Sequence, residues 1–208
     1  MQLITLLFSN PGAFVILVVL LLYSVIIHEI AHGWVAYLFG DDTAKRYGRL
    51  TLYPSSHLDP IGTIALFLVG FGWARPVPVN YNSLRSRFGL TAVALAGCLA
   101  NILIAIAAIF LLQLDTINAN PIFAPMLFIL TRINIVLSAF NLIPLPPLDG
   151  SKILMGLLPY EAQEKLARIE PYGFYILIFL LVTGMLEPVI AFMQSLIFAL
   201  IRIIFKLF

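Results

Sequence analysis

The chain has few charged residues. Only 11% of its 208 residues are charged and 62% are hydrophobic, whereas a soluble domain carries about 25% charged residues. The deficit extends along most of the chain, which predicts a polytopic membrane protein and excludes a soluble domain with one anchor. A formal net charge of +2 is too small to indicate a nucleic-acid partner.

Cysteine is almost absent as well. The single Cys98 excludes an internal disulfide framework and a cysteine-based zinc site, and we expect it to be a small packing residue. Residues 1–10 contain no Lys or Arg, and the apolar run that follows is too long for the h-region of a signal peptide. We therefore interpret Pro11-Gly12 as the turn into a first membrane helix.

Apolar stretches dominate what is present. The stretches that we expect to cross the bilayer are 12–39, 88–112, 122–142, 172–186 and 188–205. Residues 61–71 are also apolar, but about eleven residues are too few for a comfortable crossing, so a re-entrant loop or embedded hairpin is expected there. The sequence predicts an all-α polytopic membrane protein with five to six transmembrane helices, forming a single domain over residues 1–208.

The segment 43–87 is of mixed character. Leu50, Leu52 and Tyr53 alternate with polar residues like a short strand. Pro76 and Pro78 favour an extended backbone from Arg75 to Val79. We therefore expect short β-strands in this segment, on the cytoplasmic side after the first helix.

Basic residues predict the orientation. Lys and Arg gather in 41–87, in 151–171 and at the C-terminus, and 113–121 has none. Positive residues mark cytoplasmic loops, so these three regions are expected inside and 113–121 outside. Short loops and the absence of a targeting segment favour a prokaryotic cytoplasmic membrane. Arg132 is unusual because it lies in the middle of an apolar span, where a charge must face protein or water.

The most informative motif is His28-Glu29-Ile30-Ala31-His32. Two histidines four residues apart lie on one helix face, about 6 Å apart along the axis. Both imidazoles can bind one zinc ion, and the intervening glutamate can act as a general base. Placing two histidines and a carboxylate within the membrane costs free energy, so we expect these residues to have a functional role.

A catalytic zinc needs a third protein ligand, and Asp149 is the strongest candidate. It lies in a stretch, 141–150, that three prolines break just after a predicted span. His28 lies near the cytoplasmic end of its helix, and Asp149 follows a helix that runs toward the same side of the membrane. We therefore expect both residues at the same depth in the bilayer. The alternative role for Asp149 is a turn residue before Gly150.

Two further polar residues have alternative roles. Asn141 is a candidate donor to the oxyanion of the reaction, or else the cap of a helix end. His57 lies outside the metal spacing, and we expect a structural role for it in an Asp59-Pro60 turn.

With zinc bound, the coordinated water has a pKa of about 7, and Glu29 would take the proton of that water.

These motifs together resemble the site-2 protease family of intramembrane zinc metalloproteases. The resemblance lies in residues 28–33, 57–63, 96–101 and 141–150, and it is closest to the compact subgroup in 71–80 and 170–173. It implies one zinc ion per chain bound by His28, His32 and Asp149, a catalytic Glu29, and Asn141 near the scissile carbonyl. It also implies no fused PDZ or CBS module. Cys98 departs from the proline that the family commonly has there.

The leading hypothesis is an intramembrane zinc endopeptidase that cuts transmembrane protein or peptide substrates within or near the lipid bilayer, toward the cytoplasmic side. A substrate helix must unwind, and its extended chain could pair with the strand-like parts of 43–87. The alternatives are a membrane metal transporter or a non-proteolytic metal-binding scaffold using the same His/His/Asp set. A transporter would need metal ligands on both sides of the membrane along its conduction path. A non-proteolytic scaffold would not need a general base such as Glu29. The oligomeric state stays open.

Overall fold

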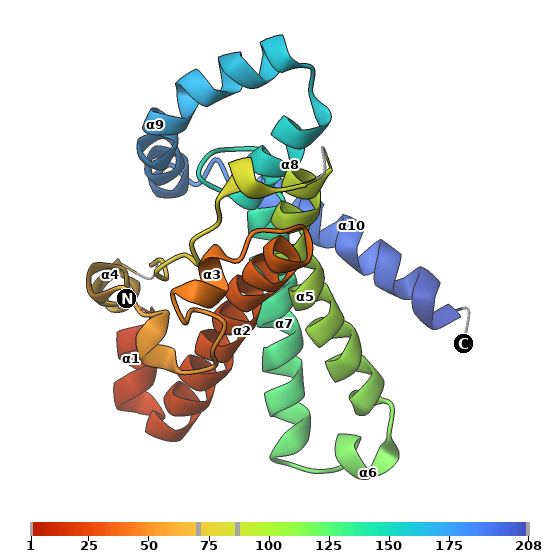
Figure 1. The fold of residues 1–208 in the computed structure, drawn as a ribbon. Helices are drawn as coiled ribbons and strands as arrows, with labels where there is room; N and C mark the ends of the chain where they lie inside the picture. Colours follow the sequence, from red (N-terminus) through yellow and green to blue (C-terminus); the bar gives the residue numbers. More distant parts are fainter. Residues whose placement is uncertain (1, 70–71, 86–87, 207–208) are drawn as a thin grey trace.

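The protein is almost entirely helical (Figure 1). The computed structural model describes residues 2–69, 72–85 and 88–206. Within this part, four helices are long and apolar enough to cross a membrane. They are α2 (Pro11–Leu38), α5 (Gly89–Leu112), α7 (Phe123–Asn141) and α10 (Glu187–Lys206). The shorter or more polar helices are α1 (Gln2–Ser9), α3 (Thr43–Arg46), α4 (Pro60–Val69), α6 (Asp115–Asn118), α8 (Asp149–Leu157) and α9 (Tyr160–Val182).

The four apolar helices coincide with four of the predicted spans, 12–39, 88–112, 122–142 and 188–205. The fifth predicted span, 172–186, is instead the second half of α9 and the turn after it, with Pro171 inside the helix. The first half of α9 carries charged residues such as Glu164 and Arg168, which form an exposed ion pair. The all-helical class is therefore confirmed with four candidate spans.

Helix α2 begins where the sequence predicts. The Asn10 side chain accepts a hydrogen bond from the Ala13 backbone N–H at 3.1 Å, and Pro11 occupies the first helical position. Both features are typical of helix N-termini, since the cap satisfies a free donor and proline has none to lose. The helix ends before Gly40, whose φ of +105° favours glycine.

Helix α5 packs against both α2 and α7, and these three helices form the centre of the molecule (Figure 1). Its buried face is rich in small residues, Ala94, Gly97, Ala105 and Ala108 among them. Small residues let helix backbones approach closely, which is the main source of helix association in lipid. On its other side, Ile197 and Ile201 of α10 complete a buried apolar cluster with α5 and α7.

Polar side chains also connect the spanning helices. Asn134 of α7 donates a hydrogen bond to the Ser24 hydroxyl of α2 at 2.9 Å. The Ser138 hydroxyl of α7 donates to the Cys98 carbonyl of α5 at 3.2 Å. Asn101 of α5 is fully buried, and its amide has no hydrogen-bond partner within the described residues.

The segment after α2 is irregular. In its described residues there is no regular strand, and its β-pairing is one antiparallel bridge between Leu58 and Ala74. Pro76 and Pro78 explain this, because proline supplies no N–H to a β-ladder. The short helix α4 occupies the stretch that was predicted to be re-entrant. Residues 70–71 and 86–87 of this segment, which include Phe71 of the compact-subgroup motif, lie outside the described residues.

Two side chains hold this segment in place. His57 is buried, and its Nε2 lies 2.7 Å from the Thr51 carbonyl, in keeping with the structural role expected for it. Asp59 accepts a hydrogen bond from the Gly62 N–H at 2.7 Å in the first turn of α4. Neither side chain lines the cavity described below.

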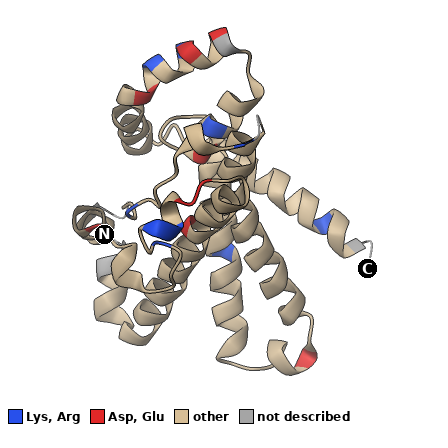
Figure 2. Cartoon of the chain, in the orientation of Figure 1, with Lys and Arg blue, Asp and Glu red and all other residues tan. Residues whose placement is uncertain are grey.

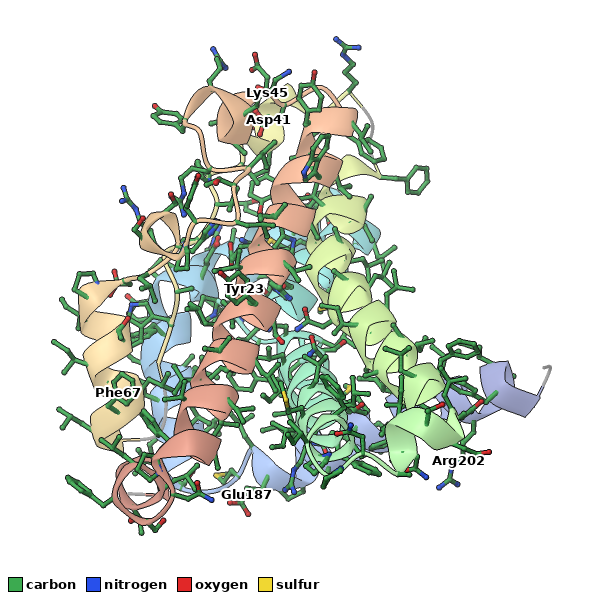
Figure 3. All side chains as sticks on the ribbon, turned by 90° about the horizontal axis from the view of Figure 1, so that it is seen from below. Tyr23, Asp41, Lys45, Phe67, Glu187 and Arg202 are labelled. Carbon is green, nitrogen blue, oxygen red and sulfur yellow. The ribbon has the colours of Figure 1, made fainter. Side chains whose placement is uncertain are left out.

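Asp41 anchors the same segment to the end of α2 (Figure 3). Its carboxylate is 1% exposed and accepts hydrogen bonds from the Thr43 N–H, the Thr43 hydroxyl and the Asn80 N–H. Burial alone would raise the pKa of Asp41, but these donors outweigh it and hold the pKa below its usual value. The ionised carboxylate therefore contributes to the stability of the fold.

Charged residues gather at one end of the molecule. Figure 2 shows most of them on the segments around α3, α8 and α9, and few on the lower halves of α5 and α7. This distribution leaves the spanning helices apolar, as the sequence predicts.

Candidate metal centre and active site

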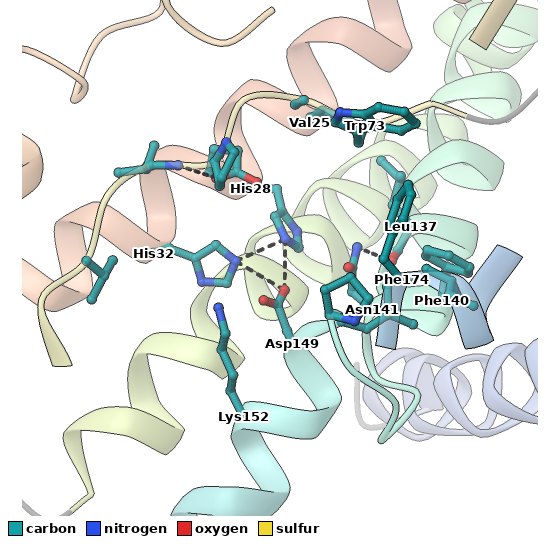
Figure 4. A pocket seen from close by; sticks show the side chains of 18 of the residues that line it. Val25, His28, His32, Trp73, Leu137, Phe140, Asn141, Asp149, Lys152 and Phe174 are labelled. Carbon is teal, nitrogen blue, oxygen red and sulfur yellow. Dashed lines mark hydrogen bonds and ion pairs between the residues drawn. The ribbon is translucent and has the colours of Figure 1, made fainter. Parts of the chain in front are cut away.

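Residues from two distant parts of the chain meet in one cluster (Figure 4). His28 and His32 come from α2, and Asp149 is the first residue of α8. The His28 Nε2 and His32 Nε2 atoms lie 3.0 Å apart, and they lie 3.0 and 3.1 Å from Asp149 Oδ2. The structure thus brings together the three residues that the sequence predicted as ligands.

This triangle of atoms fits a zinc ion. Three ligand atoms at about 2.0–2.1 Å from a tetrahedral zinc lie about 3.3 Å from one another. The observed separations of 3.0–3.1 Å are close to this value. Two imidazole nitrogens and one carboxylate oxygen are also a donor set that catalytic zinc takes, with a fourth position left for water.

A hydrogen bond at Nδ1 of His32, the ring nitrogen that faces away from the cluster, sets the tautomer of this ring. Its Nδ1 lies 2.7 Å from the Val93 carbonyl, which only accepts hydrogen bonds, so Nδ1 carries the proton. The Nε2 atom of the neutral ring then presents its lone pair to the cluster, as a metal ligand must. His28 is also buried, and its Nδ1 has no partner within the described residues.

Gly97 of α5 makes room for both rings. A Cβ atom at this position would lie 2.5 Å from His32 Nε2 and 2.6 Å from His28 Nε2. Such separations are far inside van der Waals contact, which begins at about 3.5 Å. Only glycine therefore allows α5 to pass this close behind the two histidines.

Asp149 reaches the histidines because α7 stops before it. The helix ends at Asn141, and the proline-containing stretch that follows turns the chain into α8. Gly150 packs directly on backbone carbonyls, since a Cβ there would lie 2.3 Å from the Ile143 oxygen. Burial alone would raise the pKa of Asp149, but the bonds to His28 and His32 hold it below its usual range.

Glu29 and Asn141 face the same cavity, which has a volume of about 530 Å³. The Glu29 carboxylate accepts a hydrogen bond from the Val77 N–H at 2.8 Å. The Asn141 amide donates to the Leu137 carbonyl at 3.0 Å, which leaves its second N–H free to bind another acceptor. The cavity is therefore lined by the three candidate ligands and by both residues predicted to assist the reaction.

The structure adds cavity residues that the sequence analysis did not select. Val77 is one of them. Its backbone N–H binds Glu29, and nothing in the sequence indicates that contact. Trp73 and Phe174 line the cavity with their rings 5.4 Å apart in a T-shaped arrangement. Lys152, one helical turn after Asp149, also lines it, and that spacing is a signal that could have identified it. Burial lowers the pKa of Lys152, but Tyr81 and nearby acids outweigh this and raise it, so the amine is cationic.

Comparisons with known proteins agree with this site. The family described as "Peptidase family M50" matches residues 113–184. A Bacillus subtilis protein named "Putative zinc metalloprotease YwhC" is 44% identical over 80% of this chain and 80% of its own length. The Mycolicibacterium smegmatis protein named "Putative zinc metalloprotease Rip2" is 31% identical over 86% of this chain and 71% of its own.

A third relative, "Zinc metalloprotease MJ0392" of Methanocaldococcus jannaschii, is 31% identical over 72% of this chain and 36% of its own length. No solved structure matches the chain. The matches cover most of the chain, and their names agree with a cluster whose donor set suits zinc. The chain belongs to peptidase family M50, the site-2 proteases, and is a zinc metalloprotease.

Proposed function

We propose that this protein is an intramembrane zinc endopeptidase that hydrolyses peptide bonds in or near transmembrane segments of other membrane proteins. The observation that carries the proposal is the convergence of His28, His32 and Asp149 beside Glu29, in a cavity against two membrane-candidate helices. A soluble protease would not need its metal ligands on a helix as apolar as α2.

His28, His32 and Asp149 hold one zinc ion in this account. When bound, the metal lowers the pKa of a coordinated water toward about 7 and polarises the substrate carbonyl. Glu29 takes the proton of the attacking water and later gives it to the leaving amine. The hydrogen bond from the Val77 N–H holds the Glu29 carboxylate at the cavity wall while it does so.

The other cavity residues position the substrate. The free N–H of Asn141 donates to the oxygen of the scissile carbonyl as negative charge develops there. Trp73, Ala74, Pro76, Val77 and Val79 of the irregular segment line the cavity, and an unwound substrate segment lies along them. Such a segment exposes the peptide bonds that an intact helix shields.

The proposal extends to the setting of the whole chain. Residues 1–208 act as a single membrane-embedded metalloprotease domain, a multi-pass protein of a prokaryotic cytoplasmic membrane. The charged end around α3, α8 and α9 faces the cytoplasm, in agreement with the positive residues there (Figure 2). The metal cluster lies toward this end, so cleavage occurs toward the cytoplasmic face of the bilayer. The segment around α4 enters this face without crossing.

The test is a comparison of the wild type with Glu29→Gln in native membranes. The variant is expected to keep its zinc and to retain uncut substrates, because the general base is lost and the ligands are intact. Membrane proteins that copurify with the variant are then co-expressed with each form, and cleavage is followed by immunoblot. Glu164→Gln on the exposed face of α9 is the matched control and is expected to cut normally.

The alternative functions give different results. A metal transporter would keep most of its zinc flux into proteoliposomes when Glu29 is changed to Gln, and no membrane protein would be cut by the wild type. A non-proteolytic scaffold would retain the same membrane proteins in both forms, all of them intact. Either result would overturn the proposal.

A further inference from the structure

A second cavity lies away from the metal centre and shares no lining residue with the first cavity. Its volume is about 740 Å³, within the range of ligand-binding sites. It lies between α10 and the paired helices α5 and α7, where α10 diverges from them (Figure 1). The lining residues are Ile109, Leu112, Gln113, Asn118, Phe128, Thr131, Arg132, Ile135, Val136, Gln194 and Phe198.

Arg132 is the feature that sets this cavity apart. It lies nine residues, or about 13.5 Å, from either end of α7, at the middle of a membrane-candidate helix. A guanidinium at that depth is costly unless an anion or water faces it. Within the described residues Arg132 forms no ion pair, and no carboxylate lines the cavity.

Several polar residues line the cavity besides Arg132. Helical side chains tilt toward the N-terminus of their helix, and this tilt brings the guanidinium of a residue such as Arg132 within reach of the Phe123 end of α7. Gln113 and Asn118 lie at that end, in the connection between α5 and α7. Neither side chain has a hydrogen bond within the described part of the chain, and the buried Thr131 hydroxyl has none either.

Most of the remaining lining is apolar, with Gln194 of α10 as the polar exception. Phe128, Val136 and Phe198 are exposed on membrane-candidate helices, so they face lipid in the bilayer. A ligand with an anionic head and a long apolar tail matches this lining, because Gln113 and Asn118 lie at the α6 end and Val136 lies one helical turn farther from that end than Arg132. Acidic side chains of another protein would supply the charge but would not need the apolar wall.

We propose that this cavity binds one anionic phospholipid from the leaflet at the α6 end. Its phosphate is bound by Arg132, with Gln113 and Asn118 donating to the headgroup. Its acyl chain lies along Val136 and Phe198. Basic pockets between membrane helices bind anionic headgroups by the same chemistry.

The test titrates the purified protein in dodecyl maltoside with phosphatidylglycerol or phosphatidylcholine and counts bound lipids by native mass spectrometry. We expect one tightly bound phosphatidylglycerol per chain, with phosphatidylcholine binding at least tenfold more weakly. Arg132→Gln is expected to weaken phosphatidylglycerol binding by tenfold or more, and Arg132→Lys by less. Inorganic phosphate, which has no tail, is expected not to compete.

Arg202→Gln is the matched control. It removes the same charge from α10 but lies outside the cavity, at the edge of the molecule (Figure 3). It is expected to bind phosphatidylglycerol like the wild type. Asn118→Leu, at the end of the short helix α6, gives a second variant that leaves the spanning helices unchanged, and several-fold weaker binding is expected. Circular dichroism checks that each variant keeps its helices.

Three results would overturn the proposal. The first is equal binding of the two lipids, and the second is wild-type binding by both Arg132→Gln and Asn118→Leu. The third is displacement of the lipid by inorganic phosphate. An oligomer that dissociates in Arg132→Gln without any change in lipid binding would assign the arginine to a protein partner instead.

Discussion

Gly97→Ala is expected to remove zinc while leaving the helices intact. The new Cβ would lie 2.5 Å from His32 Nε2 and 2.6 Å from His28 Nε2. Normal contact needs about 3.5 Å, so one or both rings must move by about 1 Å. Zinc–ligand distances tolerate about 0.2 Å, and the displaced rings can no longer share one ion with Asp149.

The magnitude follows from these displacements. Changes in the residues that orient zinc ligands cost up to about 100-fold in affinity, and a shift five times the tolerance belongs at that upper end. We therefore expect about 100-fold weaker zinc binding, or about 2.7 kcal/mol. Alanine also favours a helix by about 1 kcal/mol over glycine, so α5 itself gains stability.

The assay measures zinc binding in detergent by competition with a chelator of known affinity, together with helix content and thermal unfolding. Gly12→Ala is the control, because a Cβ there meets only Asn10 Oδ1 at 3.7 Å. It is expected to bind zinc like the wild type. If Gly97→Ala binds zinc within threefold of the wild type, the histidines do not hold the metal in the observed arrangement.

Three further predictions concern other parts of the fold. Val77→Pro removes the N–H that holds Glu29, so about tenfold slower cleavage with normal zinc content is expected, and Val77→Ala should cut normally. Asp41→Asn weakens three hydrogen bonds of a buried carboxylate and should lower thermal stability by about 2 kcal/mol. Because folding lowers the pKa of Asp41, the stabilisation from its ionised carboxylate is present above pH 3.8 and is lost as the pH falls through the folded-state pKa. The Asp41→Asn variant lacks this stabilisation, so it should unfold in acid at a higher pH than the wild type. Asp149→Ala should lose zinc, and a variant that kept it at full occupancy would exclude Asp149 as a ligand.

The sequence predicted the spanning helices and the metal cluster for physical reasons. A run as apolar as α2 has few alternatives to a membrane helix. The spacing of His28 and His32 places both rings on one face of such a helix. Asp149 could be added because a proline-broken stretch ends at the same depth as the histidines.

Other features depend on tertiary packing that one sequence does not display. Residues 172–186 are apolar, but they continue a charged helix, and the boundary predicted at Tyr172 is not a helix boundary. Backbone donors carry no residue signature, so the bond from Val77 to Glu29 could not be predicted. Gly97 was noted in a motif, but its contact with the two histidines became clear only when α2 and α5 were placed together.

The most direct test of the account is zinc-edge X-ray absorption of the purified protein. A zinc ion on His28, His32 and Asp149 should show two imidazole nitrogens and further light ligands at about 2.0–2.1 Å, with no sulfur near 2.3 Å. In His32→Ala the imidazole contribution should fall by half, or the zinc should be lost. A spectrum with a sulfur ligand, or one unchanged by His32→Ala, would contradict a zinc site built from His28, His32 and Asp149.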